Sequence, residues 1–528
     1  MRTIDKAEEY YDYVVIGSGF GGSISALRLA EKGYSVLVVE KGKSFEKEDF
    51  PVSNWRLRKW LWLPSVRFFG FFKMTFFRHV GILSGVGVGG GSLVYANTLA
   101  RPEKKFFSSG SWAGLRDWNE ELLPYYDLAE KMLGADENPK LFDSDLALEE
   151  LAKRNGISEK FSRTRVGVFF GEPEKVVPDP YFGGDGPDRE GCSFCGGCMT
   201  GCRHNAKNTL DRNYLYLAEK KGAQVLARHR VIAVTPEGKL DGSEGYLVTY
   251  RKSTSILYSP KKSVNCSGVI FAGGVLGTVR LLLNMKKKML PGLSEMTGYE
   301  IRTNNESLVL VDTPDKSKDF SKGVAIGSIL QTDEHSHLEP VRYASGSGFW
   351  KTLGVPLTHG RNAVLRCGKL VKSLVTKPGS WLHIYFTRDF ARQSVILLYM
   401  QHLNSTLRLA KGPVFLKSTL SDGSAPTAFM PESKTLANEM SSILGGKPFV
   451  LVTEAVAGIP TTAHILGGAV IGKDISTGVI DADHKVFGYE NMYICDGSAV
   501  SANPGVNPSL TISAMTERAM SKIAVKLK

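Results

Sequence analysis

Apolar and polar positions follow two different periods in the first forty residues. Residues 13–16 (YVVI) are uniformly apolar, which is typical of a strand buried on both faces. The apolar positions of 23–32 have the spacing of an amphipathic helix, and 35–39 form a second apolar run. The pattern predicts a strand, a helix and a second strand that ends at Glu40.

Strand and helix patterns alternate again after residue 206. Further strands are expected at 225–234, 246–250, 264–271, 307–311, 395–400 and 492–495, and helices at 118–133, 145–153, 207–221, 275–283 and from 509 onward. This alternation predicts an α/β fold with a doubly wound, Rossmann-like domain assembled from 1–44, 206–290 and 480–528. Residues 45–205 and 291–479 are expected to form a second domain on a largely antiparallel sheet, with a lid and a cysteine-rich segment.

A glycine motif joins the first strand to the first helix. Gly17, Gly19 and Gly22 fit G-x-G-x-x-G, in which the first glycine makes the turn and the second admits a pyrophosphate. The third lets the helix approach the strand, and Glu40 is placed to accept hydrogen bonds from ribose hydroxyls. The motif predicts a dinucleotide site and leaves FAD and NAD both open.

A second glycine loop distinguishes between these cofactors. Residues 84–97 (SGVGVGGGSLVYAN) resemble the second flavin-contacting loop of the glucose/methanol/choline (GMC) oxidoreductases, and within that family most closely the loop of the cholesterol oxidases. Those enzymes share GVGGGSLV, here 87–94, but usually have an arginine in place of Val86. The resemblance implies FAD as the cofactor, with contacts from Gly87, Gly89, Gly90, Ser92 and Asn97.

The C-terminal tail carries the same resemblance. Residues 464–468 (HILGG) resemble the family's H-P-L-G-G, while 496–498 (DGS) and 507–512 (NPSLTI) resemble its D-G-S and V-N-P-x-x-T-I. The resemblance spans the chain, strongly at both ends and weakly in the middle. It implies further cofactor contacts from Val231, Gly273, Asp496, Gly497, Asn507 and Pro508.

Three residues are candidates for catalysis. Oxidation of an alcohol requires a group that removes the hydroxyl proton while a hydride leaves the carbon. By resemblance, His464 and Asn507 occupy the family's active-site pair. Glu339 is the candidate for the carboxylate that moves a proton when a Δ5 ketone isomerises to the conjugated Δ4 ketone, with a solvated surface glutamate as the alternative interpretation.

Four of the seven cysteines lie close together. Cys192, Cys195, Cys198 and Cys202 have the C-x2-C-x2-C-x3-C spacing of iron-sulfur ligands. However, no second run exists, Arg203 replaces the usual proline, and 195–207 resembles a cholesterol-oxidase segment that carries no metal. We expect no metal and structural thiols, and an iron-sulfur cluster is the alternative.

Composition and charge bear on whether the protein spans a membrane, is exported or stays in the cytoplasm. The 42% hydrophobic and 23% charged residues are typical of a soluble globular chain, and no apolar run reaches the roughly 18 residues of a spanning helix. Residues 1–11 lack the features of a signal peptide, so we expect a cytoplasmic protein. The chain has a net charge of +13, but it contains no recognised nucleic-acid-binding motif. Instead, basic residues accompany aromatic ones at 55–78 and 361–392. Contact of 55–78 with a membrane surface is one interpretation, and a buried lid over the flavin or a dimer contact is the alternative.

These observations lead to three functional hypotheses. The first is FAD-dependent oxidation of a secondary alcohol on a bulky apolar molecule, most of all a 3β-hydroxysterol, with O2 or an unidentified electron acceptor. The second is a dehydrogenase of another lipid alcohol that passes electrons through an iron-sulfur site or a quinone. The third is a flavin- or iron-sulfur-binding redox module without alcohol chemistry.

Overall fold

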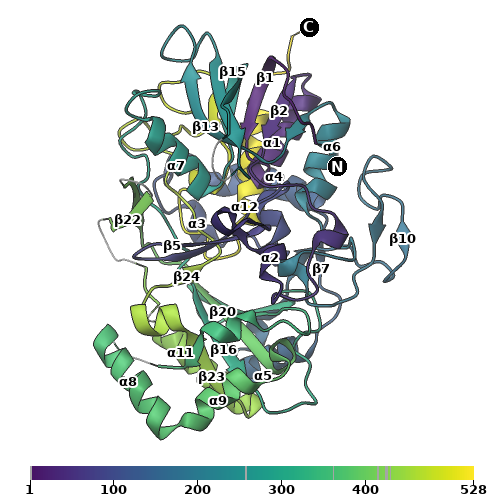
Figure 1. The fold of residues 1–528 in the computed structure, drawn as a ribbon, viewed down its shortest axis with the longest axis vertical. Helices are drawn as coiled ribbons and strands as arrows, with labels where there is room; N and C mark the ends of the chain where they lie inside the picture. The colour runs from purple at the N-terminus through teal and green to yellow at the C-terminus, as the bar shows by residue number, and fades with distance from the viewer. Residues whose placement is uncertain are drawn as a thin grey trace.

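Two seven-stranded sheets dominate the structure and lie one above the other along its long axis (Figure 1). The computed structural model describes residues 3–255, 259–358, 360, 362–412, 416–421, 426–428 and 430–527. The observed α/β fold agrees with the predicted fold class. The expected domain boundaries stay a prediction.

The upper sheet has the strand order β12-β2-β1-β15-β14-β13. Its strands are β1 (Tyr10–Ile16), β2 (Val36–Val39), β12 (Gln224–Leu226), β13 (His229–Pro236), β14 (Tyr246–Lys252), β15 (Lys262–Phe271) and β25 (Met492–Ile494). The long β15 pairs in antiparallel fashion with β14 through its first half and in parallel with β25 through its second half. The strands nearest the two ends of the chain, β1 and β25, therefore both pair with β15.

Helices pack around this sheet and around one another. They are α1 (Phe20–Glu31), α4 (Trp118–Leu133), α6 (Tyr214–Lys220), α7 (Val275–Met285) and α12 (Ser509–Ser521). α1 contacts both α6 and α12, and α12 contacts α4. Gly21 is required for this packing, since a Cβ atom there would lie 1.4 Å from the carbonyl oxygen of Cys495 at the end of β25.

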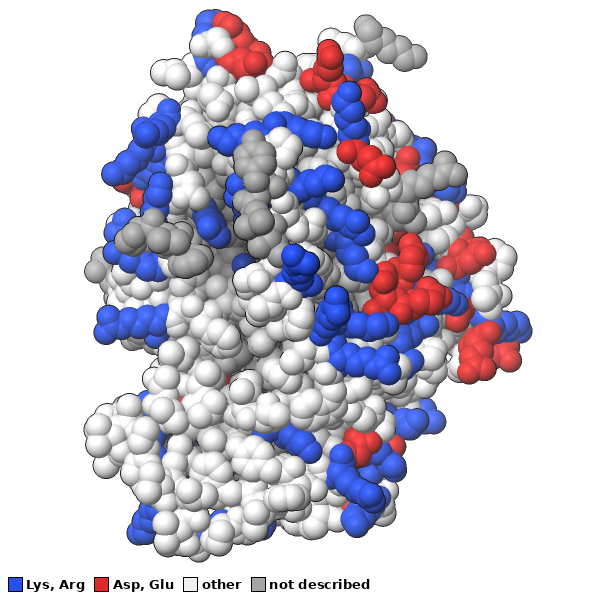
Figure 2. Space-filling model, viewed as in Figure 1, with Lys and Arg blue, Asp and Glu red and all other residues white. Residues whose placement is uncertain are grey.

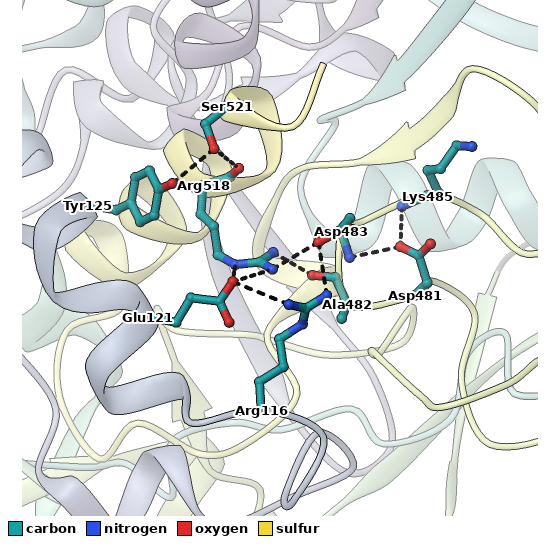
Figure 3. Close-up of polar contacts among 9 residues, drawn as sticks. All are labelled: Arg116, Glu121, Tyr125, Asp481, Ala482, Asp483, Lys485, Arg518 and Ser521. Carbon is teal, nitrogen blue, oxygen red and sulfur yellow. Dashed lines mark hydrogen bonds and ion pairs between the residues drawn. The ribbon is translucent and has the colours of Figure 1, made fainter. Parts of the chain in front are cut away.

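A polar cluster fixes the C-terminal helix (Figure 3). The buried guanidinium of Arg518 on α12 donates to Glu121 of α4 at 2.7 Å and to the carbonyl oxygen of Ala482 at 2.6 Å. It also donates to Asp483 at 2.8 Å. Because α12 starts at Ser509, two residues after the predicted site residue Asn507, this cluster helps to hold one wall of the site.

The lower sheet is entirely antiparallel, with the order β19-β23-β16-β20-β18-β17-β8. Its strands are β8 (Phe161–Arg163), β16 (Ser307–Asp312), β17 (Ser328–Gln331), β18 (Ser336–Val341), β19 (Gly354–Pro356), β20 (Ser394–Gln401) and β23 (Lys447–Leu451). Helices α5 (Asp143–Arg154) and α11 (Pro431–Leu444) pack on it.

Shorter elements connect and surround the two sheets. Residues 55–85 form α2 (Leu57–Trp60), β3 (Trp62–Leu63), β4 (Phe68–Phe69), β5 (Phe72–Phe76) and β6 (Gly81–Gly85), and β6 also pairs with β24 (Thr461–Thr462). The remaining elements are α3 (Lys104–Phe107), α8 (Ala363–Thr376), α9 (Pro378–Phe386), α10 (Phe390–Gln393), β7 (Ala135–Glu137), β9 (Arg165–Gly167), β10 (Val176–Val177), β11 (Arg189–Glu190), β21 (Leu407–Lys411) and β22 (Leu416–Leu420).

Three expectations from the sequence were wrong in detail. The helix expected at 207–221 begins only at Tyr214, because the buried ammonium of Lys207 donates to three backbone carbonyl groups and holds its segment extended. The strand expected at 225–234 divides into β12 and β13 at Arg228, whose φ is 59°. Helices α8, α9 and α11 lie in a region for which we had expected mainly strands.

Candidate active site

A cavity of about 960 Å³ lies between the two sheets. Its upper wall comes from the ends of β1 and β2 and the start of α1, and its lower wall from β16, β18 and β20. This volume is at the upper end of the range of roughly 300 to 1,000 Å³ that is typical of ligand pockets. Residues from both ends of the chain line it.

The upper part of the cavity has the geometry of a dinucleotide site. A Cβ atom at Gly19 would meet no protein atom within 4 Å, so the cavity extends up to this backbone. Gly17 has a φ of +103°, and a Cβ there would lie 2.4 Å from the carbonyl oxygen of Ala272. The Glu40 carboxylate accepts from the backbone N–H of Ser18 at 3.1 Å and of Gly87 at 3.3 Å, which ties the two glycine loops together.

The predicted cofactor residues fall into two groups. Those that line the cavity are Gly17, Gly19, Glu40, Gly90, Val231, Gly273, Asp496, Gly497, Asn507 and Pro508. Those that lie outside its lining are Gly22, Gly87, Gly89, Ser92 and Asn97. The second group shapes the loops: the Ser92 hydroxyl donates to the carbonyl of Gly89 at 2.7 Å and accepts from the backbone of Leu210 at 3.0 Å. Direct contact of any of these residues with a cofactor stays a prediction.

Five cations line the upper part of the cavity, namely Lys41, Lys73, Arg230, Arg251 and Arg280. Among the described residues, none of them lies within ion-pair distance of a carboxylate. Burial and the neighbouring Lys41 lower the pKa of Lys73 to about 7. Figure 2 shows lysine and arginine side chains around a hollow in the upper half of the molecule. Such a region suits the pyrophosphate of a dinucleotide, which supplies the missing negative charge.

His464 lies where the upper and lower parts of the cavity meet. Its Nδ1 atom is 2.6 Å from Oε1 of Glu306, which also accepts from the hydroxyl of Thr462 at 2.8 Å. The other oxygen of Glu306 accepts from the backbone of Ala463 at 3.0 Å. Burial acts to lower the pKa of His464, but the carboxylate of Glu306, with a smaller contribution from Glu339, raises it. The pair is therefore suited to accept and hold a proton.

Asn507 and Glu339 form a second buried pair. The Asn507 side chain lines the cavity, and its Nδ2 atom donates to Oε2 of Glu339 at 3.4 Å. Glu339 is fully buried behind Asn507, and its Oε1 atom lies 3.4 Å from Nε2 of His337. Within the described residues, neither Oδ1 of Asn507 nor Oε1 of Glu339 has a hydrogen-bond partner. The interpretation of Glu339 as a solvated surface residue was wrong.

Glu306 was not among the site residues expected from the sequence. This acid follows Asn304 and Asn305, both of which have a positive φ, in the part of the chain where the family resemblance is weakest. Asn304 supports the same corner, since it donates to the carbonyl of Val506 at 3.0 Å and accepts from the backbone of Gly505 at 2.9 Å. No local motif marks Glu306, and its role depends on a contact with a residue 158 positions away.

The lower part of the cavity is apolar. Alternate residues of two neighbouring strands face it, Leu308 and Leu310 of β16 and Ile396 and Leu398 of β20, as the period of a strand requires. The residues between them face the opposite core, beneath α5 and α11. The remaining apolar lining includes Phe72, Met199, Ile326, Val341, Trp350 and Leu451. The arrangement suits a large apolar ligand whose polar group meets His464 and Asn507.

The four cysteines of the run are free thiols in the structure. Among the described residues, no group of three or more His, Cys, Asp or Glu side chains is placed to hold a metal ion. Cys192 packs with Val166, Val168 and Val324, and burial raises its pKa. Burial also raises the pKa of Cys198 to about 11. Cys192 and Cys198 are therefore buried packing residues. Burial also acts to raise the pKa of Cys195, but hydrogen bonds, above all with His204, lower it to about 7. The geometry of the described residues gives the iron-sulfur candidate no support, and the absence of a metal stays a prediction.

Comparisons with known proteins agree with this geometry. A family model described as "FAD binding domain" matches residues 12–48, and one described as "GMC oxidoreductase" matches 415–516. A cholesterol oxidase of Acinetobacter baumannii is 43% identical over 98% of this chain and 95% of that protein. A cholesterol oxidase of Mycobacterium tuberculosis is 42% identical over 97% of this chain and 90% of that protein.

Solved structures share the fold at low sequence identity. Pyridoxine 4-oxidase from Mesorbium loti superposes with a TM-score of 0.62 at 13% identity, covering 97% of this chain and 98% of that chain. A fungal aryl-alcohol oxidase superposes with a TM-score of 0.61 at 13% identity, covering 98% and 99%. No helix in the described part of the chain is long and apolar enough to cross a membrane.

Proposed function

Because the chain belongs to the GMC oxidoreductases and is an FAD-dependent enzyme that oxidises alcohols, we propose that its substrate is a 3β-hydroxysterol, which it converts to the ketone. The observation that carries this proposal is the apolar lower cavity, which opens directly onto His464 and Asn507. A sterol presents one hydroxyl at the end of a rigid apolar body, and this matches a cavity with polar groups at one end only.

The residues of the upper cavity fit FAD. Gly19 leaves open space beside the first helix N-terminus, and Glu40 directly follows the second strand. The same region is lined by cations that have no ion-pair partner among the described residues. The bound flavin supplies a two-electron acceptor for the hydride of the substrate carbon. With O2 as the final acceptor, each turnover would release one hydrogen peroxide.

His464 is the proposed proton acceptor. Its Nδ1 atom is occupied by Glu306, which leaves Nε2 as the ring nitrogen available to a substrate hydroxyl. As the carbonyl group forms, the hydroxyl proton moves to Nε2, and the Glu306 carboxylate stabilises the resulting imidazolium. Asn507 is proposed to orient the hydroxyl, because its buried Oδ1 is a free acceptor among the described residues.

A second activity, isomerisation of the Δ5 ketone, is favoured by one observation. Glu339 is a buried carboxylate whose only hydrogen bond among the described residues comes from Asn507, the side chain that separates it from the cavity. A movement of Asn507 would expose Glu339 to a ketone in the site. The carboxylate could then take a proton from one carbon of the steroid and return it to another, which shifts the double bond without any net change in atoms.

The aromatic segment 55–78 is the proposed entrance for the sterol. Trp62, Pro64 and Phe72 line the cavity, while Trp55, Leu63 and Phe76 are exposed. A segment with apolar residues on both sides can receive a water-insoluble alcohol from a membrane surface. Membrane contact through this segment is part of the proposal.

Anaerobic bleaching of the flavin tests the substrate. We expect 3β-hydroxysterols to bleach it, while long-chain primary alcohols and sugars do not, and we expect His464→Ala to slow the bleaching. Bleaching by another alcohol and by no sterol would reject the sterol assignment. Failure of every alcohol to reduce the flavin would instead favour a redox module without alcohol chemistry. Peroxide formation in air, compared with reduction of an artificial dye, distinguishes an oxidase from a dehydrogenase.

A further inference from the structure

Helices α8 and α9 form a hairpin that projects from the lower end of the molecule (Figure 1). The hairpin lies outside the cavity and contributes no residue to its lining. Its outer surface is apolar: the exposed large side chains are Val364, Leu365, Val371, Leu374, Val375, Leu382, Tyr385 and Phe386. Val364 is 81%, Val375 77% and Phe386 78% exposed. So many exposed large apolar side chains on two adjacent helices of a folded protein indicate an interaction site.

The hairpin is anchored to the protein by a few apolar side chains, Leu370, Ile384 and the partly buried Trp381, and by several polar contacts. His383 of α9 lies 3.0 Å from the buried carboxylate of Asp312, at the end of β16, and Tyr385 donates to the carbonyl of Gly354 at 2.9 Å. Arg366 of α8 is buried and donates to the carbonyl of Ala455 at 2.7 Å. A core-facing helix normally buries its apolar residues and exposes its polar ones. Here several polar side chains point inward and many apolar ones point outward.

The charge of the hairpin identifies its partner. Residues 361–388 contain six lysine and arginine residues and no aspartate or glutamate. Lys369, Lys372, Lys377 and Arg388 are exposed beside the apolar residues. Figure 2 shows the surface over α8 as largely uncharged, without acidic side chains. A symmetric contact with a second copy would bring these cations against one another, whereas an anionic lipid surface would neutralise them.

We propose that the α8–α9 hairpin docks on an anionic lipid bilayer, with its valine, leucine and phenylalanine side chains in the interface and its lysines at the level of the headgroups. Lysine suits this position, since its stem lies along apolar surface while its ammonium stays near the phosphates. The docking does not depend on the substrate proposed above, because binding to vesicles needs no turnover.

The hairpin is connected to the cavity wall by direct packing. α9 contacts the short helix Phe349–Leu353, and Trp350 in that helix lines the cavity. Phe349 packs against Trp60 of the aromatic segment, with ring centroids 5.5 Å apart. Docking through α8 and α9 therefore places the lipid surface next to elements that border the cavity, and it adds a second contact site to that proposed for 55–78.

Vesicle sedimentation with the flavin-loaded protein tests the docking. Wild type should bind vesicles of phosphatidylcholine with phosphatidylserine more tightly than vesicles of phosphatidylcholine alone, and added salt should weaken this preference. Leu374→Glu with Val375→Glu should reduce binding at least about tenfold, because each change removes an apolar side chain from the interface. Lys369→Gln, Lys372→Gln and Lys377→Gln together should abolish the preference for phosphatidylserine.

A matched control distinguishes loss of the docking surface from a general effect of added negative charge on vesicle binding. Val176→Glu with Leu240→Glu changes two apolar residues that are 58% and 70% exposed elsewhere, and it should leave vesicle binding unchanged. All variants should keep their flavin and oxidise sterol presented in detergent micelles at the wild-type rate. Unchanged vesicle binding by the α8 variant, or no binding by wild type, would overturn the proposal. So would a wild-type dimer in light scattering that the Leu374→Glu, Val375→Glu variant converts to a monomer.

Discussion

The Nδ1 atom of His464 lies 2.6 Å from the Oε1 atom of Glu306, so that the candidate catalytic imidazole is paired with a carboxylate from the lower sheet. Glu306 directly precedes β16, which supplies part of the apolar lining. The same segment therefore supports the proton acceptor and forms the wall beside a large apolar substrate. The proposed chemistry depends on the two parts of the molecule being held together at this contact.

The first prediction concerns pH dependence. If His464 accepts the proton, kcat/KM falls as the pH drops through its pKa, which Glu306 raises against the effect of burial. Glu306→Gln removes this stabilisation and should move the acid limb of the profile to lower pH. It should also reduce the plateau by about 100-fold, since glutamine stabilises the imidazolium poorly.

Steady-state oxidation of a sterol across the pH range measures both effects. Glu295→Gln, at a glutamate whose side chain is 93% exposed, is the matched control and should keep the wild-type profile. An unchanged acid limb in Glu306→Gln would remove His464 from the role of proton acceptor.

The second prediction separates oxidation from isomerisation. Glu339→Gln keeps the size of the side chain and removes the carboxylate that would carry the proton. We expect the unconjugated Δ5 ketone to accumulate, while oxidation falls by less than about tenfold because His464 and Glu306 are intact. Chromatography of the products, with ultraviolet absorption for the conjugated ketone, measures the ratio. Conjugated ketone formed at the wild-type rate would reject Glu339 as the isomerisation base.

The third prediction concerns cofactor binding. The pKa of Lys73 is about 7 in the protein alone, because the residue is buried among other cations. A bound pyrophosphate favours the charged form, so FAD binding near neutral pH should take up a proton. Calorimetric titration in buffers of different ionisation enthalpy measures this uptake.

Lys73→Gln should abolish part of the proton uptake and weaken FAD binding by about tenfold. Its affinity should also depend less on salt than that of wild type. The exposed Lys59→Gln serves as the control and should leave both quantities unchanged. Equal proton uptake by Lys73→Gln and wild type would place the titrating group elsewhere.

The fourth prediction concerns stability. Arg518 is buried and joins α12, α4 and the 481–485 segment, as Figure 3 shows. Arg518→Leu should lower the free energy of unfolding by about 1–3 kcal/mol, since Glu121, Asp483 and the Ala482 carbonyl lose a shared donor. Urea unfolding measures this. Arg154→Leu breaks an exposed ion pair with Glu150 and should lower the free energy of unfolding by less than about 0.5 kcal/mol. An equal effect of the two substitutions would contradict the stabilising role of Arg518.

The fifth prediction concerns the cysteine run. The purified protein should contain no stoichiometric iron and show only the visible spectrum of a flavin. Cys192→Ala should therefore leave this spectrum unchanged, because the thiol packs against Val166 and Val168 rather than binding a metal. Iron at a fixed ratio to the protein, lost in Cys192→Ala, would restore the electron-transfer hypothesis.

The sequence by itself indicated the fold class and, through the family resemblance, FAD as the cofactor, and it named His464 and Asn507 as candidate site residues. The G-x-G-x-x-G motif is readable because its physics is local: a turn, a close approach and a helix N-terminus occur within a few residues. In the structure, β1 ends at Ile16 and α1 begins at Phe20, so the glycine loop joins the strand to the helix as the motif predicts. His464 and Asn507 belong to motifs of the same kind, although their catalytic roles stay predictions.

Only the tertiary structure decided which groups surround those motifs. Glu306 meets His464, Glu339 meets Asn507, and the cations around Lys73 gather because separate sheets and loops pack together. The four cysteines show the reverse case, since their recognisable spacing does not bring together, among the described residues, a group of side chains placed to hold a metal ion. Local motifs specify backbone geometry, whereas charge pairing, pKa values and the apolar cavity depend on contacts between residues that are distant in the chain.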